Sequence, residues 1–370
     1  MRRVSARKDR MRARCCTVKQ FKRWLQGASG TVTGKLDSTL AHPILSMTDI
    51  VGIIVRHIDV GTGMNARCVN KFWRDAVKEA GLEPLGGFHH QQKLQRLLQT
   101  EHAVWTPQKQ AMLYDHVSRQ PEITNSMRVM LVNFLIEMHC KYDWLTQRCL
   151  HLAVRIVDHY LATVVVKRRH YQLVGVTAFR IACRSAKGDV GEILDVAVLS
   201  RMTDHTSSPG EIEAKERDIL GTLDAGFRDL PTMSNFLPRL CAAAKLNIAA
   251  RASRELTREH SIALYFLDIA SLNSTIMALR PSLVTAAAIM CTLRVLGRKD
   301  WSPQLEYYST HRRDLVAPLA EILEAAAQDA QAPAIILKYT RKRFGGDGEN
   351  GSVQGCLHVI SAYRQSRRVV

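Results

Sequence analysis

Apolar residues recur at three- and four-residue steps along the stretch 127–179, which is the spacing of one face of an α-helix. The steps fall into three stripes that are separated by short polar breaks. The stripes are Met127, Met130, Leu131, Phe134, Leu135 and Met138; Leu150, Val154, Val157 and Leu161; and Leu173, Val176 and Phe179. This pattern predicts three helices that turn their apolar faces towards a core.

Two of these stripes each contain one charged residue. Arg128 shares the inner side of the first helix with Leu135, and Asp158 shares the inner side of the second helix with Leu161. A charge that is buried without a partner is strongly destabilising. We therefore expect the guanidinium of Arg128 and the carboxylate of Asp158 to pair across the contact between the two helices.

The segments that carry the stripes resemble the cyclin box. They read MRVML, NFLIE, HLAVRIVDHYL and YQLVGVTAF. In the cyclin family, the first helix opens MRAIL and continues with DWL, and the third helix opens LQLVG. The expected Arg128–Asp158 pair falls on the ion pair that ties the first two helices of that family together. Further along, PTMSNFLPRL and IILKYTRKRF resemble the start and the end of the family's second box.

The resemblance implies an all-α fold of two tandem five-helix repeats, at 107–230 and 231–344. Helices of the first repeat are expected near 125–140, 145–163, 167–184, 190–200 and 209–224, with Thr124 or Asn125 as the first cap. In the second repeat, Pro281 is expected to open an Ala-rich, buried helix. The stretch 302–330 is also expected to be helical.

Residues 44–80 show a separate helical pattern that resembles an F-box. Its apolar positions are Ile50, Ile54, Ile58, Val69 and Trp73. Ser46 stands where that family usually has proline. An F-box before a cyclin box is the order found in the cyclin F branch of the family. The resemblance implies binding to the Skp-type linker of a cullin ubiquitin ligase, and the alternative is two packed helices of no special role.

Composition describes a folded protein with basic ends. The chain has 370 residues, of which 46% are hydrophobic, and a formal net charge of +18. Much of this charge lies in the leader 1–43 and in the tail 345–370, so it indicates solvated ends or an import signal more than a sequence-specific nucleic-acid surface. The segment 81–106 connects the F-box-like unit to the first repeat. The nine cysteines show no CxxC spacing, which favours a reducing compartment, nuclear or cytoplasmic.

The motifs of common enzymes and cofactor sites are missing from the sequence. It contains no G-x-S-x-G, HExxH, Walker or kinase signature. A G-x-G-x-x-G at Gly346, Gly348 and Gly351 lacks a preceding strand, and Asp347 would repel phosphate. We therefore expect no catalytic residues, no metal and no cofactor. The longest apolar run, 282–293, is too short to span a membrane.

The cyclin resemblance implies a kinase-binding face on the first repeat. Members of the family present a lysine at the end of the third helix and a glutamate in the fifth. Arg184 and Glu216 hold those positions here. Arginine keeps the charge but replaces a compact ammonium with a planar fork. Ordinary surface charges are the alternative interpretation.

A second implied surface is a patch that docks Arg-x-Leu-type peptides. The residues at the family's patch positions are Met127, Leu131, Phe134 and Gln172, with Glu137 placed to pair with the peptide arginine. An apolar groove provides affinity, and a neighbouring carboxylate selects cationic ligands. Phe134 stands where tryptophan is usual. The alternative is that Met127 and Phe134 belong only to the core.

The sequence thus predicts a non-enzymatic, cyclin-like adaptor that binds a cyclin-dependent protein kinase, recruits substrates to a Skp-cullin-F-box ligase, or does both. Two alternatives remain open. One is a conventional kinase-activating cyclin in which 44–80 is only structural. The other is a nucleic-acid-binding protein with the same fold, similar to transcription factor IIB, although specific nucleic-acid binding and membrane binding are not expected.

Overall fold

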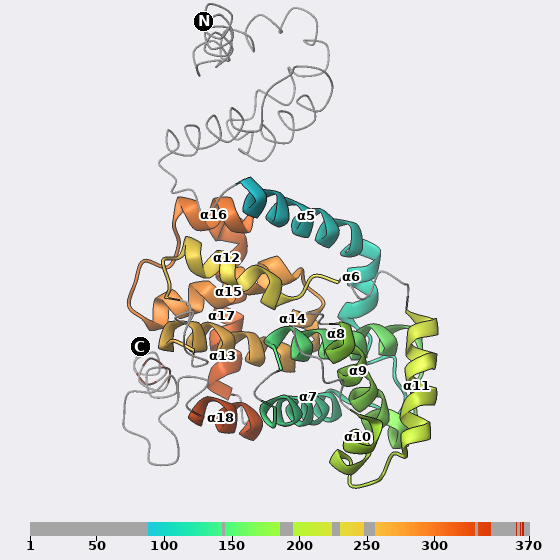
Figure 1. Ribbon diagram of the computed structural model, residues 1–370. Helices are drawn as coiled ribbons and strands as arrows, with labels where there is room; N and C mark the ends of the chain where they lie inside the picture. Colours follow the sequence, from blue (N-terminus) through green and yellow to red (C-terminus); the bar gives the residue numbers. More distant parts are fainter. Residues whose placement is uncertain are drawn as a thin grey trace, which may run out of the picture. The chain divides into compact units, whose positions relative to one another are not determined.

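In the part of the chain that the computed structural model describes, the regular secondary structure is helical (Figure 1). That part comprises residues 88–142, 145–185, 195–223, 230–247, 256–329 and 332–341, together with residues 360, 363 and 365. The all-α fold class is confirmed for these residues. The leader 1–43, the F-box-like segment 44–80 and the Gly-rich stretch 345–351 lie outside them.

In the described residues of the first repeat, five helices follow α6 (Pro107–Tyr114). They are α7 (Asn125–Cys140), α8 (Gln147–Thr163), α9 (Tyr171–Ser185), α10 (Val196–Met202) and α11 (Pro209–Thr222), with the single turn η1 (Arg168–His170) before α9. Local sequence explains the helix starts. The Thr124 hydroxyl accepts a hydrogen bond from the Met127 amide at the start of α7. Ser208 and Glu211 form a reciprocal capping box at the start of α11.

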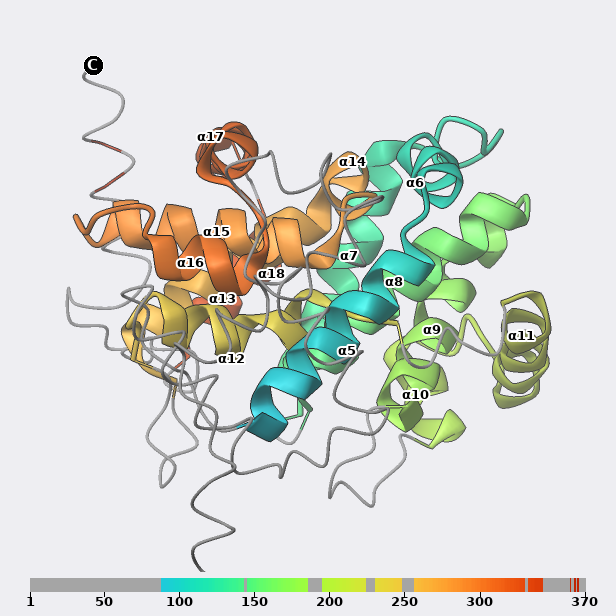
Figure 2. The same ribbon diagram turned by 90° about the horizontal axis from the view of Figure 1, so that it is seen from above.

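The second repeat surrounds one buried helix, α15. Its elements are α12 (Met233–Ala243), α13 (Arg258–Leu272), α15 (Pro281–Val295), α16 (Pro303–Ser309) and α17 (Arg313–Asp329), with the short α14 (Ser274–Met277) between α13 and α15. Thirteen of the fifteen residues of α15 are buried, and α12, α13 and α17 pack against it (Figure 2). Pro281 occupies its first turn, as the sequence predicts. Its alanines allow the neighbouring helices to approach closely.

Two local expectations differ from the structure. The stretch 302–330 contains two helices, because Thr310 adopts a left-handed conformation with φ of 63° and ends α16. Met130, which the apolar pattern placed on the inner face of α7, is 62% exposed. Three- and four-residue spacing cannot separate the edge of an apolar stripe from its centre.

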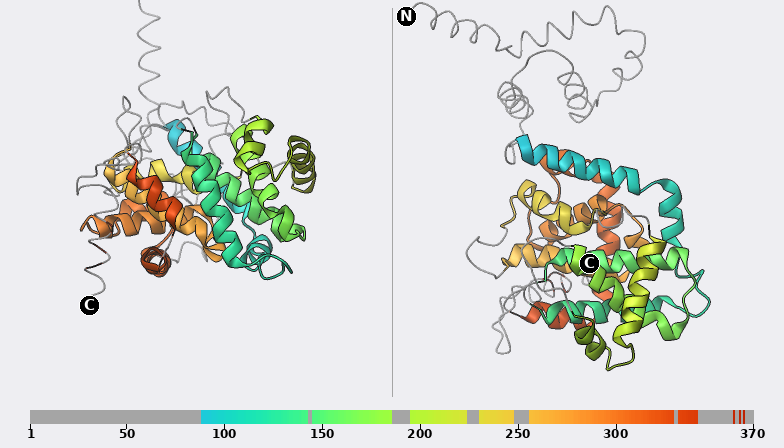
Figure 3. Two further views of the ribbon diagram at one scale, coloured as in Figure 1. Left: turned by 90° about the horizontal axis from the view of Figure 1, so that it is seen from below. Right: turned by 45° about the vertical axis from the view of Figure 1, so that its right-hand side comes forward.

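A helix that precedes the first repeat packs onto the second repeat. Figure 3 shows the repeats side by side, with α5 (Phe88–Val104) along one edge. Glu101 of α5 is buried and accepts hydrogen bonds from the Ser282 amide (2.7 Å) and hydroxyl (2.6 Å) at the start of α15. An acceptor at this position is favourable because it satisfies free amides of the helix N-terminus.

At the other end of the chain, α18 (Pro333–Thr340) packs against α7, so the second repeat ends on the first (Figure 1). The short α6 (Pro107–Tyr114) lies beside α14 (Figure 2). Among the described helices, none combines the length and apolar character that crossing a lipid bilayer requires.

Candidate functional site

The charged residues on the apolar faces of α7 and α8 meet in the core. Arg128 Nε lies 2.8 Å from Asp158 Oδ1, and Arg128 Nη2 lies 2.7 Å from Asp158 Oδ2. The two residues are 1% and 4% exposed. Burial alone would raise the pKa of the Asp158 carboxyl, but the charge and hydrogen bonds of Arg128, with a further contact from His116, hold it well below its usual range.

The same arginine also reaches the second repeat. Arg128 Nη1 donates to the carbonyls of Ser271 (3.1 Å) and Leu272 (2.9 Å) in the last turn of α13. Helix C-termini leave carbonyls without intrahelical partners and attract cations. The pair therefore fixes the angle between α7 and α8 and also joins the two repeats.

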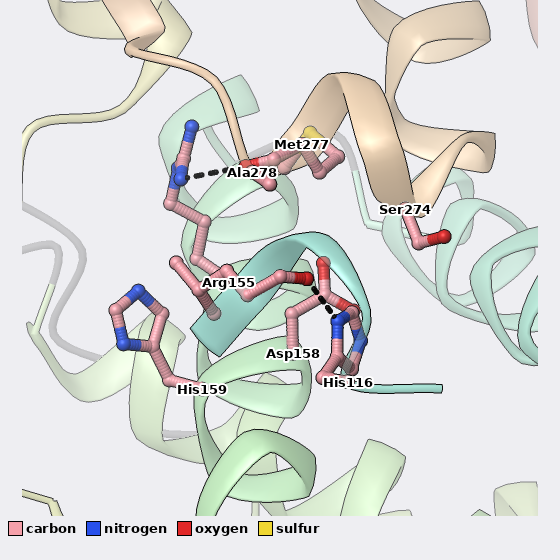
Figure 4. A pocket seen from close by; sticks show the side chains of 8 residues that line it. His116, Arg155, Asp158, His159, Ser274, Met277 and Ala278 are labelled. Carbon is pink, nitrogen blue, oxygen red and sulfur yellow. Dashed lines mark hydrogen bonds and ion pairs between the residues drawn. The ribbon is translucent and has the colours of Figure 1, made fainter. Parts of the chain in front are cut away.

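A second buried cation, Arg155, lies one turn before Asp158 and was not predicted. Figure 4 shows it reaching towards α14, where its Nη1 donates to the Met277 carbonyl over 3.1 Å. Its guanidinium also lies over the Trp105 ring, 4.3 Å from the ring centre. Burial lowers its pKa to about 10, so it stays charged at neutral pH. Its three-residue spacing from Asp158 was the available sequence signal.

The small pocket in Figure 4 lies where side chains of the two repeats pack against each other. It is lined by Leu113, His116, Arg155, Asp158, His159, Ser274, Met277 and Ala278, and it is too narrow to hold a water molecule. His116 Nε2 faces Asp158 Oδ1 at 3.1 Å. Within the described residues, no group of three His, Cys, Asp or Glu side chains is placed to hold a metal ion.

The two residues predicted at the kinase-binding face lie together. Arg184, in the last turn of α9, donates from Nη1 to Glu216 Oε1 of α11 over 2.7 Å. The Glu216 side chain is 9% exposed, whereas the Arg184 side chain is 46% exposed. Arg180, one turn earlier on α9, also pairs with Glu216. The i, i+4 spacing of the two arginines was the signal for this missed residue.

The result is an arginine whose side chain is nearly half exposed while its partner is held in the protein. Glu216 cannot move freely, because it is nearly buried and is held by two arginines from α9. A cation at the end of α9 also complements the partial negative charge of that helix terminus. The arrangement suits recognition of a partner's carbonyl or carboxylate oxygens.

The residues predicted to dock peptides differ in exposure. Met127, Phe134 and Gln172 are half-buried and Glu137 is exposed, but Leu131 is 6% exposed and lies beneath the surface. Leu131 is therefore a core residue, whereas Met127 and Phe134, the two residues of the core alternative, keep part of their side chains in solvent. Met130, which the prediction did not include in the patch, is exposed. Viewed down the axis of α7, it lies on the same face as Phe134 and Glu137 and at an angle between them. We use "α7 patch" for Met127, Met130, Phe134, Glu137 and Gln172.

Gly175 of α9 sets the distance between α9 and α7, the helix that carries most of this patch. A Cβ at this position would lie 2.5 Å from Leu131 Cδ1. Replacing Gly175 by Ala is therefore expected to destabilise the protein by about 1–3 kcal/mol, because the buried Leu131 has little space to move. Urea or thermal unfolding of the purified variant measures the loss.

Gly221→Ala provides a matched control in α11, where an added Cβ would meet nothing within 4 Å. Alanine favours helix more than glycine, so this change should be neutral or stabilise by up to about 1 kcal/mol. If the two variants unfold alike, Leu131 does not pack against Gly175 as described.

Two family descriptions match this chain and together cover most of it. "Cyclin, N-terminal domain" matches residues 94–227, and "Cyclin, C-terminal domain" matches residues 231–347. The first includes Arg128, Asp158, Arg184 and Glu216. Neither match reaches the F-box-like segment 44–80.

Individual relatives agree with these matches. The chain is 28% identical over 226 residues to the G2/mitotic-specific cyclin-B of Patella vulgata, covering 60% of this chain and 52% of the relative. It is 27% identical over 314 residues to the G2/mitotic-specific cyclin-B of Hydra vulgaris, covering 81% and 79%. Several of the matches, including the one to the Patella protein, span about half of the length of the relative concerned.

A solved structure is similar in fold. The viral cyclin from herpesvirus saimiri aligns with a TM-score of 0.53 and 21% sequence identity, covering 65% of this chain and 98% of the viral protein. At this level of identity the comparison supports the arrangement of helices and nothing finer.

Proposed function

Because this chain belongs to the cyclin family, we propose that it is a regulatory subunit that binds and activates a cyclin-dependent protein kinase through the first repeat. One observation carries the proposal: Arg184 and Glu216, the residues at the family's kinase-contacting positions, form an oriented pair between α9 and α11. The relatives are G2/mitotic-specific B-type cyclins, which favours the kinase-activating alternative over the adaptor.

Replacing Arg184 by Ala is expected to weaken kinase binding by about tenfold or more, since a charge-assisted contact at the centre of an interface is lost. Folding should change little, because nearly half of the arginine side chain is in solvent. Titration of a labelled cyclin-dependent kinase with the full chain measures the affinity.

Arg312→Ala is the matched control, since Arg312 is also an exposed arginine paired with a carboxylate, but it lies immediately before α17 of the second repeat. It should leave the affinity unchanged. Equal affinities for wild type and Arg184→Ala would remove Arg184 from the interface, and no binding by the wild type to any such kinase would refute the proposal.

The adaptor function makes a different prediction. It needs residues 44–80, which lie outside both the described residues and the family matches. A chain that lacks 44–80 should keep kinase binding if the proposal is correct. Capture of a Skp-type linker that disappears on the same deletion would support the adaptor instead. Docking of Arg-x-Leu peptides on the α7 patch, and a nuclear or cytoplasmic location, stay predictions.

A further inference from the structure

Two cysteines lie at the same end of the contact between α8 and α9. Cys149 is in the first turn of α8 and Cys183 is in the last turn of α9. The two helices pack closely against each other. Arg148, next to Cys149, donates from Nη1 to the carbonyl of Ser185 over 3.4 Å, which holds these helix ends together.

The two thiols lie close enough for each to shift the pKa of the other. A second partner, Thr146 Oγ1, lies 3.4 Å from Cys149 Sγ. The hydrogen bond from Cys183 contributes most to lowering the pKa of Cys149 to about 6, with help from Thr146 and from the charge of Arg148. The same hydrogen bond raises the pKa of Cys183. At neutral pH the two sulfurs therefore share one proton and one negative charge.

One member of the pair can be reached from solvent. Cys183 is half-buried, whereas Cys149 is 3% exposed. The other described cysteines, Cys140, Cys241 and Cys291, are buried. Burial raises the pKa of Cys241 to about 12, so that thiol carries no reactive anion at neutral pH. Only the 149–183 pair combines a neighbouring sulfur, thiolate character and access among the described cysteines.

We propose that Cys149 and Cys183 are a modification site: a dithiol that hydrogen peroxide converts to a reversible intramolecular disulfide. In the first step the shared proton moves to Cys149, and the Cys183 thiolate attacks one peroxide oxygen. The O–O bond breaks, and the products are Cys183 sulfenic acid and hydroxide. Cys149 sulfur then attacks Cys183 sulfur, the S–O bond breaks, and hydroxide leaves. The proton on Cys149 converts one hydroxide to water, and the proton that the pair released to solvent when it ionised converts the other, so overall two thiols and one peroxide give one disulfide and two waters.

The proposed disulfide would lie next to the candidate kinase-binding residues. Cys183 immediately precedes Arg184, so the disulfide would fix the last turn of α9 against α8 directly beside the Arg184–Glu216 pair. The inference goes beyond the proposed function and does not depend on it, because the chemistry requires only this chain and peroxide.

Peptide mapping of the full chain tests the proposal. Reduced protein is treated with a few equivalents of hydrogen peroxide, blocked with N-ethylmaleimide, and digested with trypsin without reductant. We expect the peptides CLHLAVR and IACR, which contain Cys149 and Cys183, to appear as one linked species lacking two hydrogens. Of the nine thiols per chain, two should become unreactive, and dithiothreitol should restore them. Peroxide that leaves the two peptides separate, or that gives only Cys183 sulfinic acid, overturns the proposal.

Single variants assign the effect to this pair. Cys149→Ser should abolish the linked species and allow Cys183 to proceed to higher oxidation states, since no neighbouring thiol intercepts the sulfenic acid. Cys241→Ser, which changes a cysteine outside the pair, should leave the linked species unchanged. Linkage that involves Cys241 or persists without Cys149 would contradict the assignment. If Cys149→Ser does not fold, the wild-type map decides alone.

Discussion

Replacing Asp158 by Ala is expected to lower the free energy of unfolding by about 3–5 kcal/mol, which is a large part of the stability of a domain. The change leaves the Arg128 guanidinium buried and deprived of both carboxylate oxygens. It also removes the contact of His116 at 3.1 Å. Urea denaturation of the wild type and the variant, followed by circular dichroism, measures the difference.

Asp314→Ala is the control for this prediction. Asp314 pairs with Arg312, but both side chains are more than half exposed, so the loss should be at most about 1 kcal/mol. If Asp158→Ala unfolds at the same urea concentration as Asp314→Ala, the buried pair does not hold α7 against α8.

A comparable loss, again about 3–5 kcal/mol, is expected when Lys338 is replaced by Met. Lys338 of α18 and Asp268 of α13 are completely buried, and Lys338 Nζ lies 2.7 Å from Asp268 Oδ2. Lys338 also donates to Gln147 of the first repeat over 3.1 Å. Methionine fills a similar volume but leaves the Asp268 carboxylate without its countercharge. Thermal or urea unfolding of the variant measures the cost.

The double variant Lys338→Met, Asp268→Asn separates charge from packing. It should lose clearly less stability than the sum of the single variants, because no unpaired charge is left. Lys215→Met, which removes a partly exposed ion pair with Asp218, is the matched control and should cost about 1 kcal/mol or less. Simple additivity of the two single losses would show that Lys338 and Asp268 are not coupled.

The pair of Lys338 and Asp268 also makes the free energy of unfolding depend on pH. Burial alone would raise the pKa of Asp268, but the charge of Lys338 and hydrogen bonds from its neighbours lower it to about 2. A carboxyl whose pKa is lowered in the folded state contributes stability above its unfolded pKa of about 4. That contribution is lost as the pH falls from about 4 towards 2, and the double variant should lack this component of acid sensitivity.

Much of the first repeat follows from local sequence. Apolar spacing and the cap at Thr124 predict α7, since these signals lie within a few residues of the helix that they start. The Ser208–Glu211 capping box that the structure shows at the start of α11 is equally local. Arg128 and Asp158 could be paired from sequence because each is a charge at a position that apolar residues flank on the same helical face. The structure places them in contact for that physical reason.

Contacts over long sequence distances could not be predicted in this way. Lys338 and Asp268 are 70 residues apart, and a lysine near a helix end is normally a solvated charge. Glu101 meets Ser282 across 181 residues, and no local pattern indicates that a helix before the first repeat caps one in the second. Thr310 was missed because only its left-handed backbone, and no glycine or proline, ends α16.

In the candidate site, too, local sequence predicts single residues, whereas their contacts depend on long-range packing. Arg184 and Glu216 were identified singly through the resemblance, but their mutual contact depends on how α9 packs against α11. The Cys149–Cys183 pair was not recognised because the two residues are 34 positions apart and each sits in an ordinary helical pattern. Free cysteines in such patterns usually behave as small apolar residues.

The central claim is that the first repeat holds a kinase through the end of α9 and through α11. Amide hydrogen exchange of the full chain, with and without a saturating cyclin-dependent kinase, tests it most directly. The account predicts that protection on binding concentrates in α9 around Arg184 and in α11 around Glu216. Protection confined to residues 44–80, or absent from both α9 and α11, would contradict it.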